Sequence, residues 1–181
     1  MRIGDLLYFA PGLRFDEVDL DGPGLPNQFK RRMTGFYIEP AEECGRHGYA
    51  FAAGVLLVSC IDALARLRSG DGVGKRFGKF VAKELRSFSN DDLAERFYED
   101  FRNGLVHEAR LKNGGQFSLE TGDTVEQLRG IILVNPYRLA KEVRGALDSY
   151  VTLLTSNEAE REKLADALRR DHSEDFRVAG A

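Results

Sequence analysis

The sequence is organised around residues 101–110, which read FRNGLVHEAR. Arg102, Asn103 and His107 fall within six residues there, at the end of a segment with helical periodicity. The apolar positions of this segment recur at the spacing of one helical face: Ala94, Phe97, Tyr98, Phe101 and Leu105. We therefore expect a helix over about 90–107, with its aromatic side chains in the core and the three polar residues on the opposite side.

Helix geometry relates these polar side chains to one another. At about 100° per residue, Asn103 and His107 lie on the same face, whereas Arg102 and His107 are roughly 140° apart. Arg102 and His107 could converge through the length of the arginine, through a helix loosened at Gly104, or through a second subunit. In the alternative interpretation, Arg102 is an exposed arginine and His107 closes the helix end, where positive charge is favoured. The expected N-cap of this helix is Ser89.

The pattern Arg102-Asn103-x-x-x-His107, on a helix rich in aromatic residues and followed by a turn, resembles the Arg-x(4–6)-His signature of HEPN domains. The resemblance covers roughly residues 50–155, which hold a long apolar helix, a shorter one, the motif helix and at least one more. It implies an all-α bundle that is usually dimeric. Many HEPN domains are metal-independent ribonucleases, and others only bind or scaffold.

The resemblance assigns a role to each motif residue. His107 would do acid/base work, because histidine titrates near neutrality. Arg102 would stabilise the phosphate with its fork of donors, and Asn103 would orient the scissile group. The reaction would be attack of a ribose 2′-OH on the adjacent phosphate. Family members act in toxin–antitoxin and antiviral defence systems, so a cognate antitoxin is an implied partner. A non-catalytic RNA- or protein-binding dimer is the alternative.

A long helix with very few polar residues is expected from Pro40 to about Arg68. Its polar exceptions Ser59, Asp62 and Arg66 form one narrow stripe. This stripe either faces solvent, with Asp62 and Arg66 paired, or lines the cleft into which Arg102 and His107 point. We predict that Asp62 lies within reach of Arg102 or His107, because an unpaired buried charge is costly.

A basic face is expected on the next helix. A glycine-rich loop over 69–74 precedes it and lacks the residues of a phosphate-binding Walker loop. Lysines then recur at four-residue steps with an arginine beside them, at Lys75, Arg76, Lys79 and Lys83. This face either is only solvated or contacts RNA. No cofactor or metal is expected, since neither cysteine has a partner at ligand spacing and the three histidines are far apart.

The composition of the chain limits the classes of protein to which it can belong. The 181 residues predict a single domain in which hydrophobic residues make up 43% and charged residues 30%, an ordinary globular balance. The net charge of −3 excludes a global basic field for nucleic acid, so RNA contacts would be local. No apolar signal core follows the first residues, and charges interrupt the most apolar stretch. We expect a cytoplasmic protein without a membrane partner.

The fold class that follows is mainly α, a HEPN-like up-and-down helical bundle with a small appended β-hairpin. Residues 1–36 are expected to form a surface arm with one short extended piece, and 37–171 the helical core. In the hairpin near 116–134, two strands over 116–120 and 130–134 pair across a linking segment. Residues 172–181 are expected to be a flexible tail. We also predict a homodimer in which Arg102 and His107 line a shared cleft.

Overall fold

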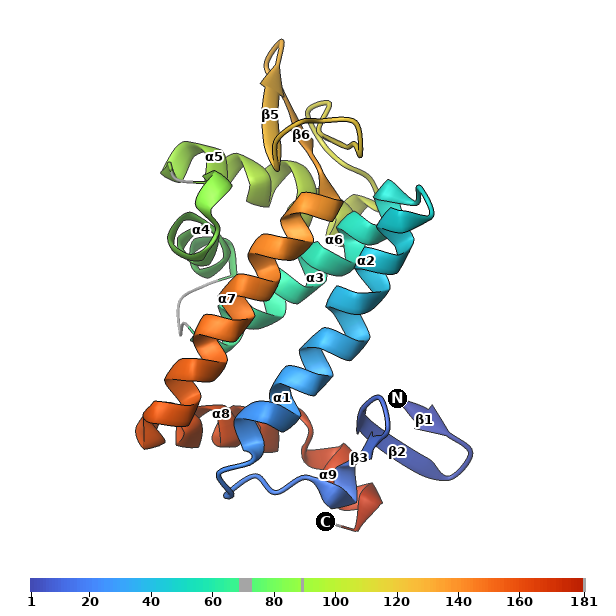
Figure 1. Cartoon of the computed structure of the whole chain (residues 1–181), viewed down its shortest axis with the longest axis vertical. Coiled ribbons are helices and arrows are strands. Elements are labelled where there is room, and N and C mark those ends of the chain that lie inside the picture. Colours follow the sequence, from blue (N-terminus) through green and yellow to red (C-terminus); the bar gives the residue numbers. More distant parts are fainter. Residues whose placement is uncertain (69–72, 89, 181) are drawn as a thin grey trace. The chain divides into compact units, whose positions relative to one another are not determined.

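The computed structural model describes residues 1–68, 73–88 and 90–180 (Figure 1). Within these ranges the chain is mainly helical and has two small three-stranded sheets, which confirms the predicted fold class at that level. The chain divides into two compact units. Unit 1 comprises Met1–Phe36 and Leu147–Ala181, and unit 2 comprises Tyr37–Ala146. The single domain predicted from the sequence stays a prediction.

Unit 1 begins with a sheet of antiparallel strands in the order β1 (Arg2–Ile3), β2 (Leu6–Ala10) and β3 (Leu13–Arg14). The expected surface arm with one extended piece is therefore wrong in part. The chain reverses at Pro11-Gly12, where Gly12 has φ +65°, so that Ala10 and Leu13 become partners. Three apolar side chains of this region are buried: Phe9, Ala10 and Phe15.

The helices of unit 1 are α1 (Leu25–Met33), α8 (Glu158–Asp171) and α9 (Ser173–Ala179), joined by the second part of α7 (Pro136–Ser156). Phe29 of α1 meets Tyr150 of α7 edge-on, with ring centroids 6.0 Å apart. The flexible tail expected over 172–181 is wrong where α9 forms. Phe176 anchors this helix, because its ring is buried and lies 5.0 Å from that of Phe15.

His172, between α8 and α9, is a titratable group of unit 1 that lies among aromatic rings. Its ring centroid lies 5.5 Å from that of Phe15 and 6.4 Å from that of Phe9, and its Nδ1 is 3.0 Å from a carboxylate oxygen of Asp175. Burial lowers the pKa of His172 below 6.5, an effect that the hydrogen bond to Asp175 opposes and the nearby Arg32 reinforces.

Mild acid is therefore expected to weaken unit 1. Between the lowered pKa of folded His172 and 6.5, the unfolded chain binds more protons than the folded chain. The stability contributed by neutral His172 is complete above pH 6.5 and is lost as the pH falls through the folded pKa. Urea unfolding at roughly pH 7.5 and 5.5 tests this, with a larger drop expected for wild type than for His172→Gln. An equal drop in both proteins would contradict it, and exposed His47→Gln serves as the control.

Unit 2 begins at Tyr37, inside a stretch of helical residues. A π-helical segment, Thr34–Ile38, follows α1 and leads directly into α2 (Glu39–Arg46). Pro40 lies in the first turn of α2, as expected, but helical residues also precede it. Proline has no N–H to continue the hydrogen bonding of a preceding α-helix, and the π segment ends two residues before it. The expected helix over 40–68 is also interrupted, because Gly48 has φ +80° and α3 starts afresh at Ala50–Arg68.

Helix α3 is the core helix of unit 2 and packs against α2, α4 (Val73–Glu84) and strand β4 (Gln116–Phe117). Its length of 19 residues and its mean hydropathy of 1.8 would also suit a membrane-spanning helix. Buried core helices commonly have the same length and hydropathy, so these two values do not distinguish the two kinds of helix. Its fully buried side chains include Leu57, Cys60, Ile61 and Leu64. Burial raises the pKa of the Cys60 thiol to about 12, so this thiol stays protonated and unreactive. The expected loop over 69–74 lies mostly outside the described residues.

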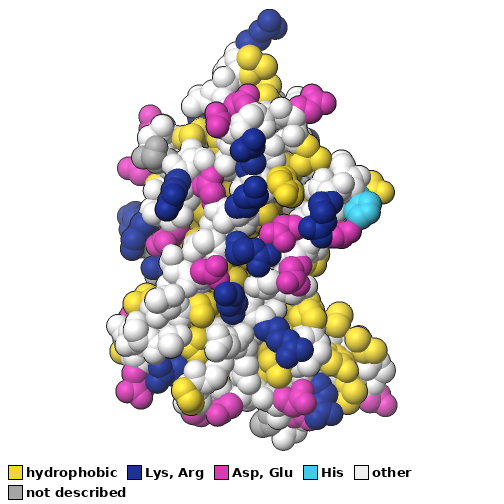
Figure 2. Space-filling model, viewed as in Figure 1, with side chains coloured by type: hydrophobic (Ala, Val, Ile, Leu, Met, Phe, Trp, Pro, Cys, Tyr) yellow, Lys and Arg dark blue, Asp and Glu magenta, His cyan; other side chains and the backbone are white. Residues whose placement is uncertain are grey.

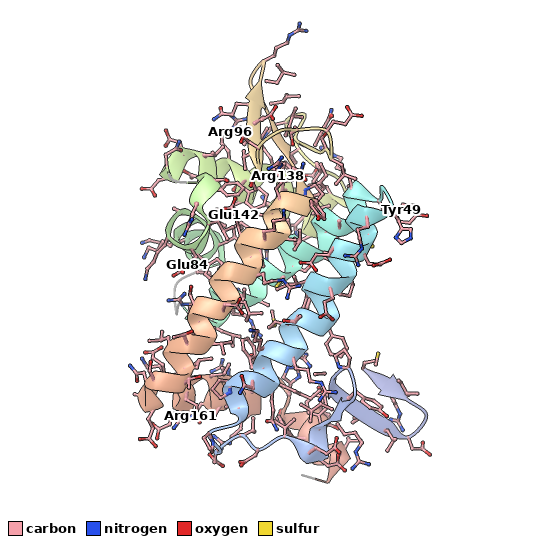
Figure 3. All side chains as sticks on the ribbon, viewed as in Figure 1. Tyr49, Glu84, Arg96, Arg138, Glu142 and Arg161 are labelled. Carbon is pink, nitrogen blue, oxygen red and sulfur yellow. The ribbon has the colours of Figure 1, made fainter. Side chains whose placement is uncertain are left out.

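Polar contacts fix the elements around α4. Arg68 donates to Glu84 at 2.7 Å, which ties the end of α3 to the end of α4. Beyond α4, Ser87 donates its backbone N–H and its hydroxyl to Glu142 of α7, at 3.1 and 2.5 Å. Figure 3 labels Glu84 and Glu142 on their helices.

The sheet of unit 2 has the order β4 (Gln116–Phe117), β6 (Ile131–Val134), β5 (Val125–Leu128). The expected pairing of 116–120 with 130–134 as an antiparallel hairpin is wrong, because β4 runs parallel to β6. The hairpin partner of β6 is β5, inside the segment expected to be a linker. The turn between them consists of Arg129 and Gly130, with φ +52° and +85°, the signs that a tight hairpin turn requires.

Candidate functional site

The predicted motif helix is three consecutive helical segments rather than one regular α-helix. They are α5 (Asp91–Phe97), a π-helical segment (Tyr98–Asn103) and α6 (Gly104–Glu108). Asn90 caps α5 by accepting the N–H of Leu93 at 2.7 Å, whereas the expected cap Ser89 lies outside the described residues. Phe97 and Phe101 are fully buried, which confirms the predicted core face.

The π segment changes the direction of the motif side chains. A π turn holds more residues than an α turn, so the 140° separation inferred for a regular helix does not apply through Arg102 and Asn103. Such turns inside α-helices occur frequently at functional sites. Here the segment ends with Arg102 and Asn103 and is followed by Gly104.

Arg102 contacts Asp62 of α3, as the sequence predicted. Its Nη2 lies 3.2 Å from Asp62 Oδ2, and its guanidinium carbon lies 5.8 Å from the centre of the Tyr98 ring. The Arg102 side chain is only 12% exposed and that of Asp62 26% exposed. The carboxylate and the ring therefore hold the guanidinium in one place on the wall of α3.

This ion pair has unused hydrogen-bonding capacity. Arg102 Nε and Asp62 Oδ1 are both buried, and neither has a hydrogen-bond partner among the described residues. Leaving a buried polar atom unpaired costs about 1–3 kcal/mol, so native structures seldom tolerate it without a reason. Arg102 Nε and Asp62 Oδ1 are thus an unused donor and an unused acceptor beside the positively charged guanidinium.

Asn103 and His107 lie differently. Asn103 Nδ2 donates to Glu99 Oε2 at 2.9 Å, one helical turn back. His107 is exposed in the last turn of α6, and its ring makes no hydrogen bond or ion pair with any residue in the described ranges. The structure therefore brings Arg102 and Asp62 together, but within the described ranges His107 makes no hydrogen bond or ion pair with either. Two interpretations of His107 from the sequence therefore remain: the histidine closes the helix end, or it completes a site with Arg102 of a second subunit.

Gly104 has a role that the sequence analysis missed. After Ala109, which has φ +53°, the chain folds back so that the N–H of Arg110 reaches the carbonyl of Gly104 at 3.4 Å. A Cβ atom at position 104 would lie 2.4 Å from the carbonyl oxygen of Arg110. The position thus requires glycine because of a close backbone approach, and not because the helix must be loosened.

Gly104→Ala is therefore expected to destabilise the protein by about 1–3 kcal/mol, the usual range for an overpacked site. Alanine normally stabilises a helix relative to glycine, so the loss would have the opposite sign to the helix propensity. Thermal unfolding measures it. The matched control is Gly145→Ala within α7, where an added Cβ meets nothing within 4 Å. Equal midpoints for both variants would contradict the close approach.

Asp100 supports the turn after the motif and was not predicted. It is 1% exposed, and its Oδ1 accepts from Asn113 Nδ2 at 2.6 Å. Its backbone carbonyl accepts the N–H of Lys112 at 2.8 Å, and Arg96 Nη2 lies 3.6 Å from its Oδ2. The sequence signal was its position between Phe97 and Phe101, on the face that turns inward.

The basic face of α4 is partly neutralised. Lys75 and Lys79 line a cavity of about 420 Å³ together with two glycines, Tyr98 and three carboxylates: Asp91, Glu95 and Glu99. Lys83 Nζ lies 3.9 Å from Glu84, and Arg76 is half-buried. Figure 2 likewise shows basic and acidic side chains interspersed on the face it presents. RNA contact through Lys75, Arg76, Lys79 and Lys83 stays a prediction, and it would have to overcome these carboxylates.

Within the described ranges, no three His, Cys, Asp or Glu side chains are grouped so as to hold a metal ion. No protein-family model, curated protein or solved structure matches the chain. The HEPN resemblance therefore rests on the motif and on the order of the helices.

Proposed function

We propose that this protein is a HEPN-like, metal-independent endoribonuclease that acts as a homodimer. The observation that carries the proposal is the Arg102–Asp62 pair, a nearly buried guanidinium held at 3.2 Å by a carboxylate, with a buried donor nitrogen still unpaired. A fixed guanidinium of this kind suits the charge that builds on phosphoryl oxygens, because it needs little reorganisation when that charge appears.

The chemistry would use two groups at the scissile phosphate. The ribose 2′-oxygen attacks the phosphorus, the bond to the 5′-oxygen breaks, and a 2′,3′-cyclic phosphate and a 5′-hydroxyl result. A base takes the 2′-hydroxyl proton and an acid returns one to the leaving oxygen, work for which exposed His107 is suited. Because Arg102 and His107 are not joined by a hydrogen bond within the described part of one copy, the histidine of a second copy would complete the site.

A non-catalytic dimer that binds RNA or protein is the second candidate. The specific observation in its favour is that, among the described residues, His107 makes no hydrogen bond or ion pair with Arg102 or Asp62. In that case the Arg102–Asp62 pair would only fasten the motif helix to α3.

Cleavage of total RNA in the presence of EDTA distinguishes the two candidates. The nuclease predicts fragments that end in a cyclic phosphate, and no cleavage of an oligonucleotide with 2′-deoxyribose at the scissile position. Intact RNA across several substrates would favour the binding module. Light scattering at micromolar concentration tests the dimer independently, and a monomer would remove the shared site. A cognate antitoxin would be sought as a protein that suppresses this cleavage.

A further inference from the structure

A second cavity in unit 2 lies where α7 begins, beside the end of α2 and the segment between β4 and β5. Its volume is about 430 Å³, within the range of small-molecule sites. Its lining residues are Gly45, Arg46, Leu119, Thr121, Asn135, Tyr137, Arg138 and Lys141. None of them belongs to the Arg102 site.

The charge of this lining is entirely positive. Arg46, Arg138 and Lys141 are cationic, and no lining residue is acidic. The Arg138 side chain, labelled at the start of α7 in Figure 3, makes no hydrogen bond or ion pair with the described part of the chain. Lys141 Nζ lies 5.0 Å from the centre of the Tyr137 ring and has no carboxylate partner in the described ranges. Two uncompensated cations thus share a cavity in a chain whose net charge is −3.

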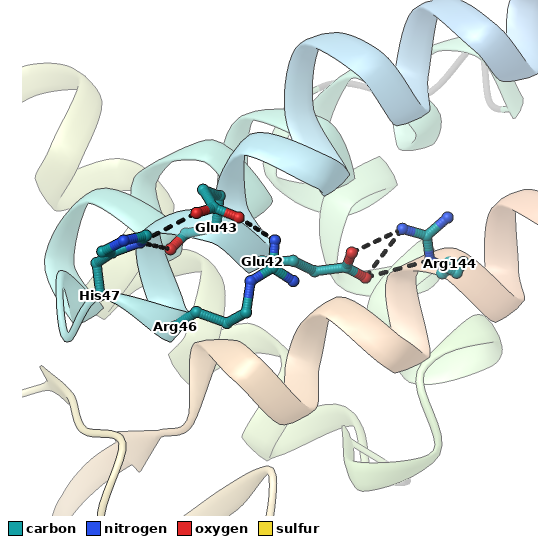
Figure 4. A network of polar contacts seen from close by, with 5 residues as sticks. All are labelled: Glu42, Glu43, Arg46, His47 and Arg144. Carbon is teal, nitrogen blue, oxygen red and sulfur yellow. Dashed lines mark hydrogen bonds and ion pairs between the residues drawn. The ribbon is translucent and has the colours of Figure 1, made fainter.

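Two acidic side chains of α2, those of Glu42 and Glu43, are already paired with other groups (Figure 4). Both oxygens of Glu42 accept from Arg144 Nη2 at 2.9 Å. Glu43 binds Arg46 and also lies 3.2 Å from His47 Nδ1. Arg46 is therefore a cation of the cavity that a carboxylate already holds, and Glu43 would compete with an anion for it.

The cavity wall at the start of α7 is rigid. Asn135 is 3% exposed, and its Oδ1 accepts the N–H groups of Tyr137 and Arg138 at 3.0 and 3.2 Å. Its Nδ2 donates to the carbonyl of Thr121 at 3.0 Å. Because these first amides of α7 are already bonded, the helix adds only its dipole, and an anion must be bound by the side chains.

We propose that this cavity binds the phosphate group of a small phosphorylated molecule. Arginine and lysine are the side chains that recognise phosphate, through charge-assisted hydrogen bonds, and three of them line one cavity here. The volume leaves room for more than the phosphate. A nucleic-acid backbone would call for a longer track of cations than these two free side chains provide. This proposal does not depend on the nuclease activity.

Calorimetric titration of the full chain with inorganic phosphate, adenosine 5′-monophosphate and adenosine tests the site. The monophosphate is expected to bind, phosphate more weakly, and adenosine not measurably. Arg138→Ala and Lys141→Ala should each weaken binding about tenfold or more, while Arg86→Ala, an exposed cation elsewhere in unit 2, should leave it unchanged. Both substitutions are at exposed helix positions, so the variants should remain folded.

Glu43→Gln gives a test of opposite sign. Releasing Arg46 should tighten binding of the monophosphate several-fold, whereas Glu39→Gln, which removes a charge from the same helix, should have little effect. Equal effects of the two would overturn the assignment of Arg46. Three results would overturn the proposal: no binding of either phosphate-bearing probe, equal binding by Arg138→Ala/Lys141→Ala, or equal competition by an RNA oligonucleotide without terminal phosphates.

Discussion

Replacing His107 with alanine is expected to lower the rate of RNA cleavage by about 10²–10⁴-fold, the contribution of a positioned general acid or base. The residue is exposed and its ring makes no hydrogen bond or ion pair with the described residues, so its removal should not affect folding. The rate is measured with a labelled oligonucleotide at saturating enzyme in EDTA, and the free energy of unfolding is measured in parallel.

The matched control for this variant is His47→Ala. His47 is also an exposed histidine near a helix end, with its Nδ1 3.0 Å from the carbonyl of Glu43. An unchanged cleavage rate in His107→Ala would refute the proposed role of this histidine. Equal losses in both variants would point to a general effect of removing surface histidines, and would also refute it.

Replacing Asp62 with alanine is expected to destabilise the protein by about 3 kcal/mol, at the low end for breaking a buried ion pair. Arg102 is 12% exposed and would keep its charge without the carboxylate that faces it. Leaving that charge unpaired is costly, whereas the net value of an intact pair is small. The double variant Asp62→Ala/Arg102→Met should therefore be more stable than Asp62→Ala alone.

Urea unfolding of wild type, both single variants and the double variant provides this comparison as a double-mutant cycle. The exposed pair Lys163–Glu160, 2.6 Å apart, is the control, because a surface ion pair contributes only about 0–1 kcal/mol. A loss below about 1 kcal/mol for Asp62→Ala would mean that water solvates Arg102. The guanidinium would then not be preorganised for a phosphate.

The parts of the fold that could be predicted from the sequence are those set by side-chain chemistry. Phe97 and Phe101 repeat at four residues, and burial of both follows from that spacing. A carboxylate in a nearly apolar helix must find a cation, and Asp62 indeed faces Arg102. The cap at Asn157, which accepts the N–H of Glu160 at 3.2 Å, was also predictable from its residue type.

The parts that could not be predicted depend on backbone geometry that leaves no periodic signal. The π segments at Thr34–Ile38 and Tyr98–Asn103 contain no proline, the residue that most clearly marks a helix interruption. The turn at Arg129 lacks the usual Asn-Gly or Asp-Gly pair, so the sequence predicts a linker where β5 forms. For the same reason, the direction of His107 relative to Arg102 could not be obtained from an angle per residue.

Because of the π segment, the site depends on the number of residues in the motif helix as well as on their types. A π turn is equivalent to one residue inserted into an α-helix, which rotates everything after it by about a quarter of a turn relative to everything before it. Phe97 lies before this inserted residue, and Gly104 and His107 lie after it. A single-residue deletion here could keep every side-chain type of the motif and still point the histidine in another direction. The number of residues between the buried aromatic side chains and the polar motif therefore sets the direction in which the motif side chains point.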